Sequence, residues 1–213
     1  MILYDDQDIV VVNKPTMLLS VPGKGPEKQD SVAYRLQQEF GEIHVCHRLD
    51  WKTSGVMVFA KNKTALRILN KQFRDRWVKK EYICRVLGSL KGQGQIEIPM
   101  IVDWPNRPRQ KVDYIEGKFA STSWQAIKTE SIEDKQSHQN YIVTRLNLVP
   151  LTGRSHQLRV HMQYLGHPIL GDTLYANPLA IQLSKRLELH ASCLCFQHPR
   201  TNEWKNFRVS CPF

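Results

Sequence analysis

Four segments with the composition of β-strands follow one another between residues 81 and 150, and no helical pattern separates them. They are EYICRVLG, GQIEIPMIV, STSWQAIKTE and YIVTRLNLVP. In the last segment every second residue belongs to one side of a period-two pattern: Ile142, Thr144, Leu146 and Leu148. Parallel neighbours would need long crossover connections, usually helices. The succession therefore predicts an α+β protein with a mixed, mostly antiparallel sheet.

Helices are predicted on either side of this strand-rich region. Residues 30–41 form a short amphipathic pattern with Asp30 as the expected N-cap. Residues 62–80 form a longer basic pattern whose apolar stripe runs to Trp77, and a third helix is expected to begin at Ser155 as its N-cap. Further strands are expected in DIVVVNKP, GVMVFAK, LCFQHP and KNFRVSC. Residues 1–213 are expected to form a single domain.

The charge of the chain indicates a polyanionic partner. It has 30 Lys and Arg against 20 Asp and Glu, a formal net charge of +10, and a field of this sign attracts RNA, DNA or an acidic membrane surface. No apolar run is long enough to span a bilayer, and the first residues are acidic where a signal peptide would be basic. Five cysteines without a framework spacing suit reduced thiols. We therefore expect a cytoplasmic protein that is not inserted in a membrane.

The stretch HRLDWKTSG, which ends just before a predicted strand, offers a candidate catalytic carboxylate in Asp50. Most aspartates in such loops only bond to neighbouring backbone groups. Arg159 is a possible partner, because it lies at the edge of an apolar helix stripe where a partly buried guanidinium would need a carboxylate. The alternative for Arg159 is a side chain that reaches from the helix flank to solvent. Tyr82 begins a strand, where an aromatic side chain is usually part of the core.

Histidines and cysteines suggest metal ligands at two places, but neither spacing matches a structural zinc site. These residues are His44, Cys46 and His47, and later His190, Cys193, Cys195 and His198. The sequence also lacks a P-loop and an HExxH motif. We therefore expect neither a metal nor a cofactor.

HRLDWKTSG, KKEY, GRSHQLRVHMQYLGHPILGD and a late LELHA occur in this order and together resemble the motif set of the RluA family of RNA pseudouridine synthases. The similarity runs from VVNKP to the C-terminal strands. It implies the pseudouridine synthase fold, a mixed sheet with a central cleft flanked by helices and loops. The chain is most similar to members without an appended RNA-binding domain. Those members isomerise uridines in 23S rRNA and in the tRNA anticodon stem-loop, and the enzyme is expected to be a monomer.

The resemblance also implies a role for each matching residue. Asp50 would be the catalytic aspartate, Tyr82 the active-site tyrosine and Arg159 the arginine paired with Asp50. Arg48 would enter the RNA stack where the target uridine has left it. The loop at residues 103–118 is too rich in Pro and charge to be core, so Arg107, Arg109 and Lys111 are expected to be exposed there and to contact phosphates. The end of the basic helix adds further candidates for phosphate contacts: Arg74, Arg76, Lys79 and Lys80.

Three matters stay open at this stage. Asp50 could attack the sugar, attack the base or remove a ribose proton. A non-catalytic RNA-binding module would also explain the charge. A metal-dependent hydrolase or phosphodiesterase would use an aspartate together with several histidines.

Overall fold

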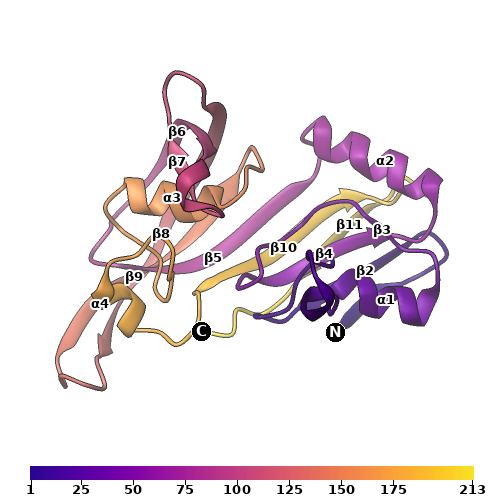
Figure 1. The fold of residues 1–213 in the computed structure, drawn as a ribbon. Coiled ribbons are helices and arrows are strands. Elements are labelled where there is room, and N and C mark those ends of the chain that lie inside the picture. The colour runs from indigo at the N-terminus through magenta and orange to yellow at the C-terminus, as the bar shows by residue number, and fades with distance from the viewer. The chain divides into compact units, whose positions relative to one another are not determined.

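Eleven strands and four α-helices make up the chain, which a computed structural model describes over all of residues 1–213 (Figure 1). The chain forms two compact units. The first contains residues 1–80 and 190–212, and the second contains residues 81–189 and Phe213. No helix has both the length and the apolar character needed to cross a bilayer.

The first unit is built on a small mixed sheet. Its elements are β1 (Ile2–Asp5), β2 (Ile9–Lys14), the 3₁₀ turn η1 (Pro26–Lys28), α1 (Val32–Phe40), β3 (His44–Val45), β4 (Ser54–Ala60), α2 (Lys63–Arg74), β10 (Leu189–Gln197) and β11 (Trp204–Arg208). Strand β4 pairs antiparallel with β2 and β3, and parallel with β10. The apolar runs of β2 and β4 are buried, and Leu69 of α2 packs in the same core cluster as Val11, Val58 and Phe196.

The second unit is an antiparallel sheet with the strand order β5–β9–β8–β6–β7. Its elements are β5 (Lys79–Leu87), β6 (Gln93–Val102), the 3₁₀ turn η2 (Trp104–Asn106), β7 (Gln110–Val112), β8 (Lys118–Glu133), β9 (Asn140–Pro150), α3 (Gln157–Tyr164) and α4 (Pro178–Gln182). Leu146 and Leu148 of β9 are buried with Leu158 and Met162 of α3. The strand-rich segment and the apolar stripe of the third helix are thus confirmed. The period-two pattern is confirmed from Thr144 to Leu148 but is wrong for Ile142, which is 48% exposed. Within each unit only the β4–β10 pairing is parallel, so the mixed, mostly antiparallel sheet is confirmed as well.

The predicted N-caps of two helices are wrong. Ser31, not Asp30, caps α1, because its side chain accepts a hydrogen bond from the Tyr34 amide (3.1 Å), while Asp30 pairs with Arg35. The residue before α3 is His156, not Ser155. His156 has a left-handed backbone (φ 55°), and its ring bonds to the Tyr175 hydroxyl instead of capping the helix.

The basic helix is shorter than predicted. It ends at Arg74, and Arg76 follows with a left-handed backbone (φ 62°) that breaks the helical path. Trp77 therefore lies outside the helix and is 49% exposed instead of completing the buried stripe. Lys79 and Lys80, which were expected near the end of this helix, begin strand β5.

Candidate active site

The loop that carries Asp50 is fixed through its backbone on both sides of that residue. Before it, the Ser20 hydroxyl donates to the Leu49 carbonyl (2.7 Å) and accepts from the Leu49 amide (3.0 Å). After it, the fully buried Lys14 ammonium donates to the Trp51 carbonyl (3.1 Å). The Thr53 amide donates to the Asp50 carbonyl (3.0 Å) and closes the turn. The half-buried Asp50 side chain is thus presented by a rigid loop.

The start of strand β4 explains the Ser-Gly pair at the end of HRLDWKTSG. The Ser54 hydroxyl hydrogen-bonds the Nδ1 atom of His190 (2.8 Å) on the neighbouring strand. Gly55 has φ 123°, and a Cβ atom there would lie 2.2 Å from the Ala191 carbonyl oxygen. Only glycine allows β10 to approach β4 this closely, so Gly55 fixes the strand that follows the Asp50 loop.

His47 has a structural part at the beginning of the same loop. Desolvation, with a smaller effect from nearby Lys80, lowers the pKa of His47 to about 3. The neutral ring accepts a hydrogen bond from the Val58 amide (3.1 Å) and stacks on Phe73 of α2 (4.8 Å between centroids). His47 therefore joins the loop to β4 and α2, and Arg48 beside it is exposed.

Arg159, in the second unit, is held by a carboxylate that was not predicted as its partner. Its Nε and Nη2 atoms donate to the two carboxylate oxygens of Asp172, at 2.8 and 2.6 Å. The side chains are 5% and 0% exposed. A bidentate pair of this kind sets the plane of the guanidinium. Asp172 also accepts from the amides of Leu174 and Tyr175, so its own position is fixed by the backbone.

Tyr175 connects Arg159 with the loop at residues 103–118. The Arg159 guanidinium lies 5.0 Å from the centroid of the Tyr175 ring, and that of Arg109 lies 5.5 Å from it. The Tyr175 hydroxyl accepts from the Gln110 amide (2.7 Å) and bonds to the His156 ring (2.7 Å). A buried aromatic ring thus contacts one arginine expected in catalysis and one expected in RNA binding.

Tyr82 lies in β5 opposite Leu148 of β9. It is half-buried and packs against the apolar core of the second unit. Asp50 belongs to the first unit, whereas Tyr82 and Arg159 belong to the second. The pairing of Asp50 with Arg159 would join the two units and stays a prediction.

The predicted phosphate contacts do not form one uniform set. Arg107 is exposed above the Trp104 ring (4.2 Å), and Lys111 is exposed with Asp113 3.5 Å away. Arg109 was expected to be exposed, which is wrong, because stacking on Tyr175 leaves it half-buried. Lys80 is also half-buried, and burial lowers its pKa.

A pocket of about 490 Å³ opens between β7 and α3 beside Arg109. Arg109, Lys111, Gln163 and Tyr164 are among its lining residues. The lining combines two cations, an amide and an aromatic side chain, which are groups that bind phosphates and nucleobases, with one carboxylate, that of Asp103.

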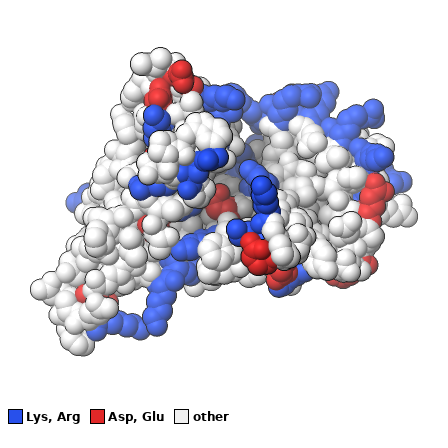
Figure 2. All heavy atoms as spheres, viewed as in Figure 1, with Lys and Arg blue, Asp and Glu red and all other residues white.

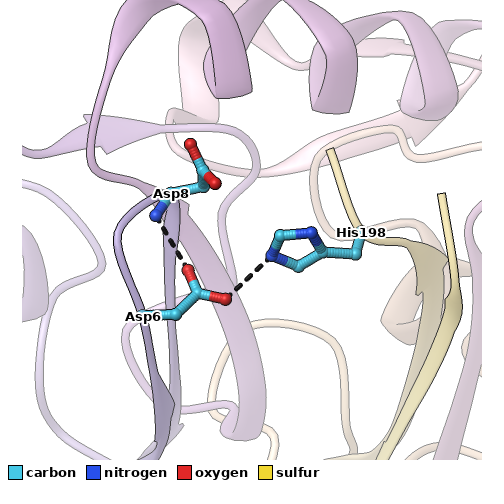
Figure 3. Close-up of side chains that lie close together, drawn as sticks. All are labelled: Asp6, Asp8 and His198. Atoms are coloured by element: carbon cyan, nitrogen blue, oxygen red, sulfur yellow. Dashed lines mark hydrogen bonds and ion pairs between the residues drawn. The ribbon is translucent and has the colours of Figure 1, made fainter. Parts of the chain in front are cut away.

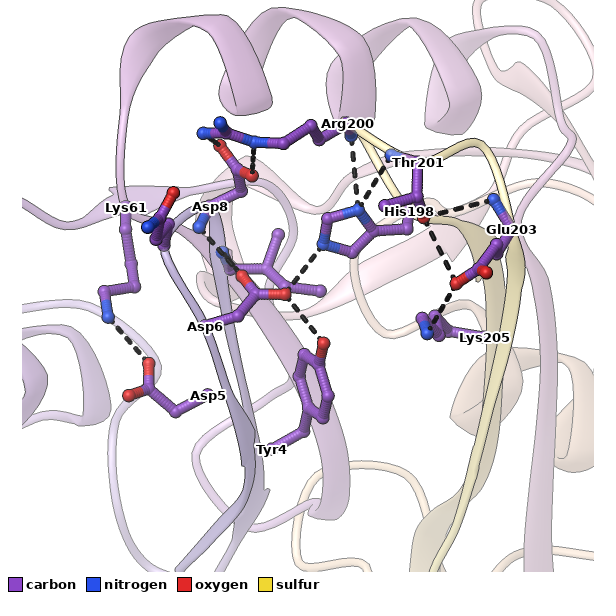
Figure 4. Close-up of polar contacts among 12 residues, drawn as sticks. Tyr4, Asp5, Asp6, Asp8, Lys61, His198, Arg200, Thr201, Glu203 and Lys205 are labelled. Atoms are coloured by element: carbon purple, nitrogen blue, oxygen red, sulfur yellow. Dashed lines mark hydrogen bonds and ion pairs between the residues drawn. The ribbon is translucent and has the colours of Figure 1, made fainter.

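One cluster of side chains could hold a metal ion, and of the histidines and cysteines named above it includes only His198. Its members are Asp6, Asp8 and His198, whose ligand atoms lie within 4.8 Å of one another (Figure 3). Each is engaged in hydrogen bonds (Figure 4). Asp6 accepts from Tyr4 and His198, and Asp8 pairs with Arg200. The His198 Nδ1 atom accepts from two backbone amides. These hydrogen bonds and ion pairs join the β1–β2 turn to the β10–β11 turn, and we call Asp6, Asp8, His198 and Arg200 together the clasp.

We expect the clasp to weaken in acid. The hydrogen bond from Arg200 is the main reason that the pKa of Asp8 falls from 3.8 to about 2. A carboxylate whose pKa is lower in the folded than in the unfolded protein stabilises the fold fully at pH values above its pKa in the unfolded chain. This stabilisation is lost as the pH falls toward its pKa in the folded protein, about 2. Asp8→Asn should therefore lower the free energy of unfolding by about 2 kcal/mol at pH 6 and by less at pH 3. Urea denaturation of the wild type and the variant at pH 6 and pH 3 measures this loss. An equal loss of stability at the two pH values would contradict the predicted role of Asp8.

Comparisons with known proteins agree with this architecture. Residues 8–164 match the family model described as RNA pseudouridylate synthase. The chain is 51% identical over 213 residues to a Yersinia pestis protein named dual-specificity RNA pseudouridine synthase RluA, covering 100% of this chain and 99% of the relative. It is 47% identical to the protein of the same name from Escherichia coli K12, and the match covers 100% of this chain and 93% of that relative.

Solved structures support the same assignment. Human RNA pseudouridylate synthase domain containing 1 superposes with a TM-score of 0.82 at 27% identity, over 100% of this chain and 83% of that one. Human RNA pseudouridylate synthase domain containing 4 superposes with a TM-score of 0.74 at 26% identity, over 99% of this chain and 88% of that one. The chain has the pseudouridine synthase fold, and it belongs to the RNA pseudouridylate synthase family.

Proposed function

We propose that this RNA pseudouridine synthase has dual specificity and isomerises uridines both in 23S rRNA and in the anticodon stem-loop of tRNA. The observation that carries the proposal is the identity of about one half with proteins named as dual-specificity synthases, over 100% of this chain and 99% and 83% of two of these relatives. Membership of the family favours a synthase over the non-catalytic RNA-binding module and over the metal-dependent hydrolase.

The reaction requires a carboxylate and an enclosed site. The bond between the base nitrogen and C1′ of the ribose breaks, the base turns, and a new bond forms between C5 and C1′. Because no atom is gained or lost apart from the exchange of a proton, the chemistry needs no redox cofactor. We assign the carboxylate to Asp50, which acts as a nucleophile or as a base.

Arg159 and Tyr82 complete the proposed catalytic set. A guanidinium beside Asp50 would favour the ionised carboxylate in a site closed off from water. The bond to Asp172 supports this role, because it holds Arg159 in one orientation before RNA binds. Tyr82 would stack on the extruded base and offer its hydroxyl for the final removal of the C5 proton.

Extrusion of the target uridine from the RNA stack costs roughly a few kcal/mol, and this cost is lowest for a uridine in an RNA loop. We assign Arg48 to the gap that the uridine leaves in the RNA stack. Its exposure next to the fixed Leu49–Asp50 backbone supports this role. Arg107, Arg109, Lys111 and Lys80 are proposed to contact the RNA, with Arg109 acting from the pocket beside Tyr175.

We expect Arg48→Ala to slow pseudouridine formation at saturating RNA by about tenfold or more, because the extruded state loses the group that fills the stack. The salt dependence of RNA binding should change less than in Lys111→Ala, which removes a phosphate contact. Single-turnover kinetics on a stem-loop and binding at several salt concentrations measure the two effects. A normal single-turnover rate for Arg48→Ala would show that Arg48 has no part in extrusion.

Dual specificity is tested by mapping pseudouridine in unmodified transcripts of 23S rRNA and of several tRNAs after incubation with the purified protein. We expect specific sites in both kinds of RNA. Modification of only one kind would contradict dual specificity while leaving the synthase activity intact.

A further inference from the structure

A stripe of four cations follows one exposed face of α2. Lys63, Arg67, Lys71 and Arg74 are all exposed, whereas Ala65, Leu69 and Gln72 form the buried face of the helix. Figure 2 shows Lys and Arg side chains gathered along this helix. The rise of 1.5 Å per residue places successive members of the stripe about 5–6 Å apart, over about 16 Å in total.

These cations have almost no acidic partners. Only Arg74 forms an ion pair, with Asp75 at 3.1 Å. Lys63, Arg67 and Lys71 have no ion pair or hydrogen bond, and the one side-chain interaction among the three is that of Lys71 with the Trp77 ring (5.9 Å). Like charges on one helix face repel one another. A stripe that keeps them without counter-charges is complementary to a regular array of phosphates.

One exposed tryptophan lies beside the stripe, and a second lies beside Lys79, which follows α2 in the chain. Trp77 follows the end of α2 and is 49% exposed, and Trp204 of β11 is 52% exposed. Lys71 lies over the first ring and Lys79 over the second, each at 5.9 Å. Cations and aromatic rings together are typical of RNA-binding surfaces, where the cations contact phosphates and the rings stack on bases.

The stripe is also connected to the loop that carries Asp50. Phe73 of α2 stacks on His47 at 4.8 Å, and His47 directly precedes Arg48. An RNA segment that lies along α2 would therefore continue from the segment that is held at Arg48 and Asp50.

We propose that Lys63, Arg67, Lys71, Arg74 and Trp77 form a stem-binding face, which holds the phosphate backbone of the helical stem adjoining the target loop. The inference rests on the proposed function and adds a partner for this helix. Insertion into a membrane does not fit the same face, because the apolar residues of α2 are buried in the protein core.

The test compares a triple variant, Lys63→Gln/Arg67→Gln/Lys71→Gln, with a control of equal charge, Lys91→Gln/Lys135→Gln/Lys185→Gln. All six residues are exposed and none forms an ion pair, so neither variant should impair folding. Binding is measured for an anticodon stem-loop and for an oligonucleotide with the loop sequence but no stem. Affinity for the stem-loop should fall about tenfold or more in the triple variant and about twofold in the control.

The salt dependence gives a second readout. The slope of log binding constant against log salt concentration should become shallower by about 2–3 in the triple variant on the stem-loop. On the stemless oligonucleotide, the triple variant and the control should behave alike. Equal weakening of stem-loop binding by both variants, or an equal loss by the triple variant on both RNAs, would overturn the stem-binding face. A wild-type protein that binds but forms no pseudouridine would instead contradict the proposed function.

Discussion

Asp50→Asn is expected to abolish pseudouridine formation while RNA affinity stays within about a factor of ten, equivalent to 1.4 kcal/mol. The amide has nearly the shape of the carboxylate but is neither a useful nucleophile nor a base. Bonds from Ser20 and Lys14 hold the backbone on either side of the residue. The loop should therefore keep its conformation, and the loss should fall on the chemical step.

Single-turnover assays and filter binding on the same stem-loop separate the two effects for Asp50→Asn. Asp30→Asn is a suitable control, because Asp30 is an exposed carboxylate that pairs only with Arg35 in the first helix. It should leave both measurements unchanged. Appreciable product from Asp50→Asn would rule out the assignment of the catalytic carboxylate.

Arg159→Ala is expected to lose both stability and activity. It leaves the fully buried Asp172 carboxylate without the guanidinium that binds both of its oxygens. Breaking a buried pair by truncating one partner typically costs about 3–5 kcal/mol. Lys at this position should rescue only in part, because a single ammonium cannot reproduce the planar fork. Urea denaturation gives the loss of stability, and a loss below about 1 kcal/mol would contradict the expectation.

A double variant separates the structural part of this pair from its catalytic part. In Arg159→Met/Asp172→Leu both charges are replaced by apolar side chains, which is often neutral or stabilising relative to the buried pair. The double variant should therefore regain most of the stability lost in Arg159→Ala but remain inactive. Restored activity would show that Arg159 serves only to neutralise Asp172.

The strands were predictable from the sequence because their pattern is local. The alternation through Leu146 and Leu148 requires only that one face of β9 be buried, and the structure shows that burial. The ends of the helices were less predictable, because they depend on individual backbone conformations. Nothing in the sequence marks Arg76 as left-handed, and that one residue ends the stripe before Trp77.

The supporting residues of the site were missed for a different reason. Asp172 lies within the motif that suggested Arg159, and a carboxylate so close to a helical arginine was an available signal. Lys14 gave no such signal, because lysine is almost never fully buried, yet it is 0% exposed and binds the carbonyl of Trp51. Tyr175 and Arg109 meet only through the tertiary fold, which spacing along the chain does not reveal.

The most direct test of the central claim uses RNA that carries tritium at C5 of its uridines. Formation of the new C5–C1′ bond expels the C5 hydrogen to solvent, so tritium release reports isomerisation of the base. The wild-type protein should release about one tritium per modified site without cleaving the strand or liberating uracil, and Asp50→Asn should release none. Strand cleavage or free uracil without tritium release would contradict the assignment of this chain as an aspartate-dependent pseudouridine synthase.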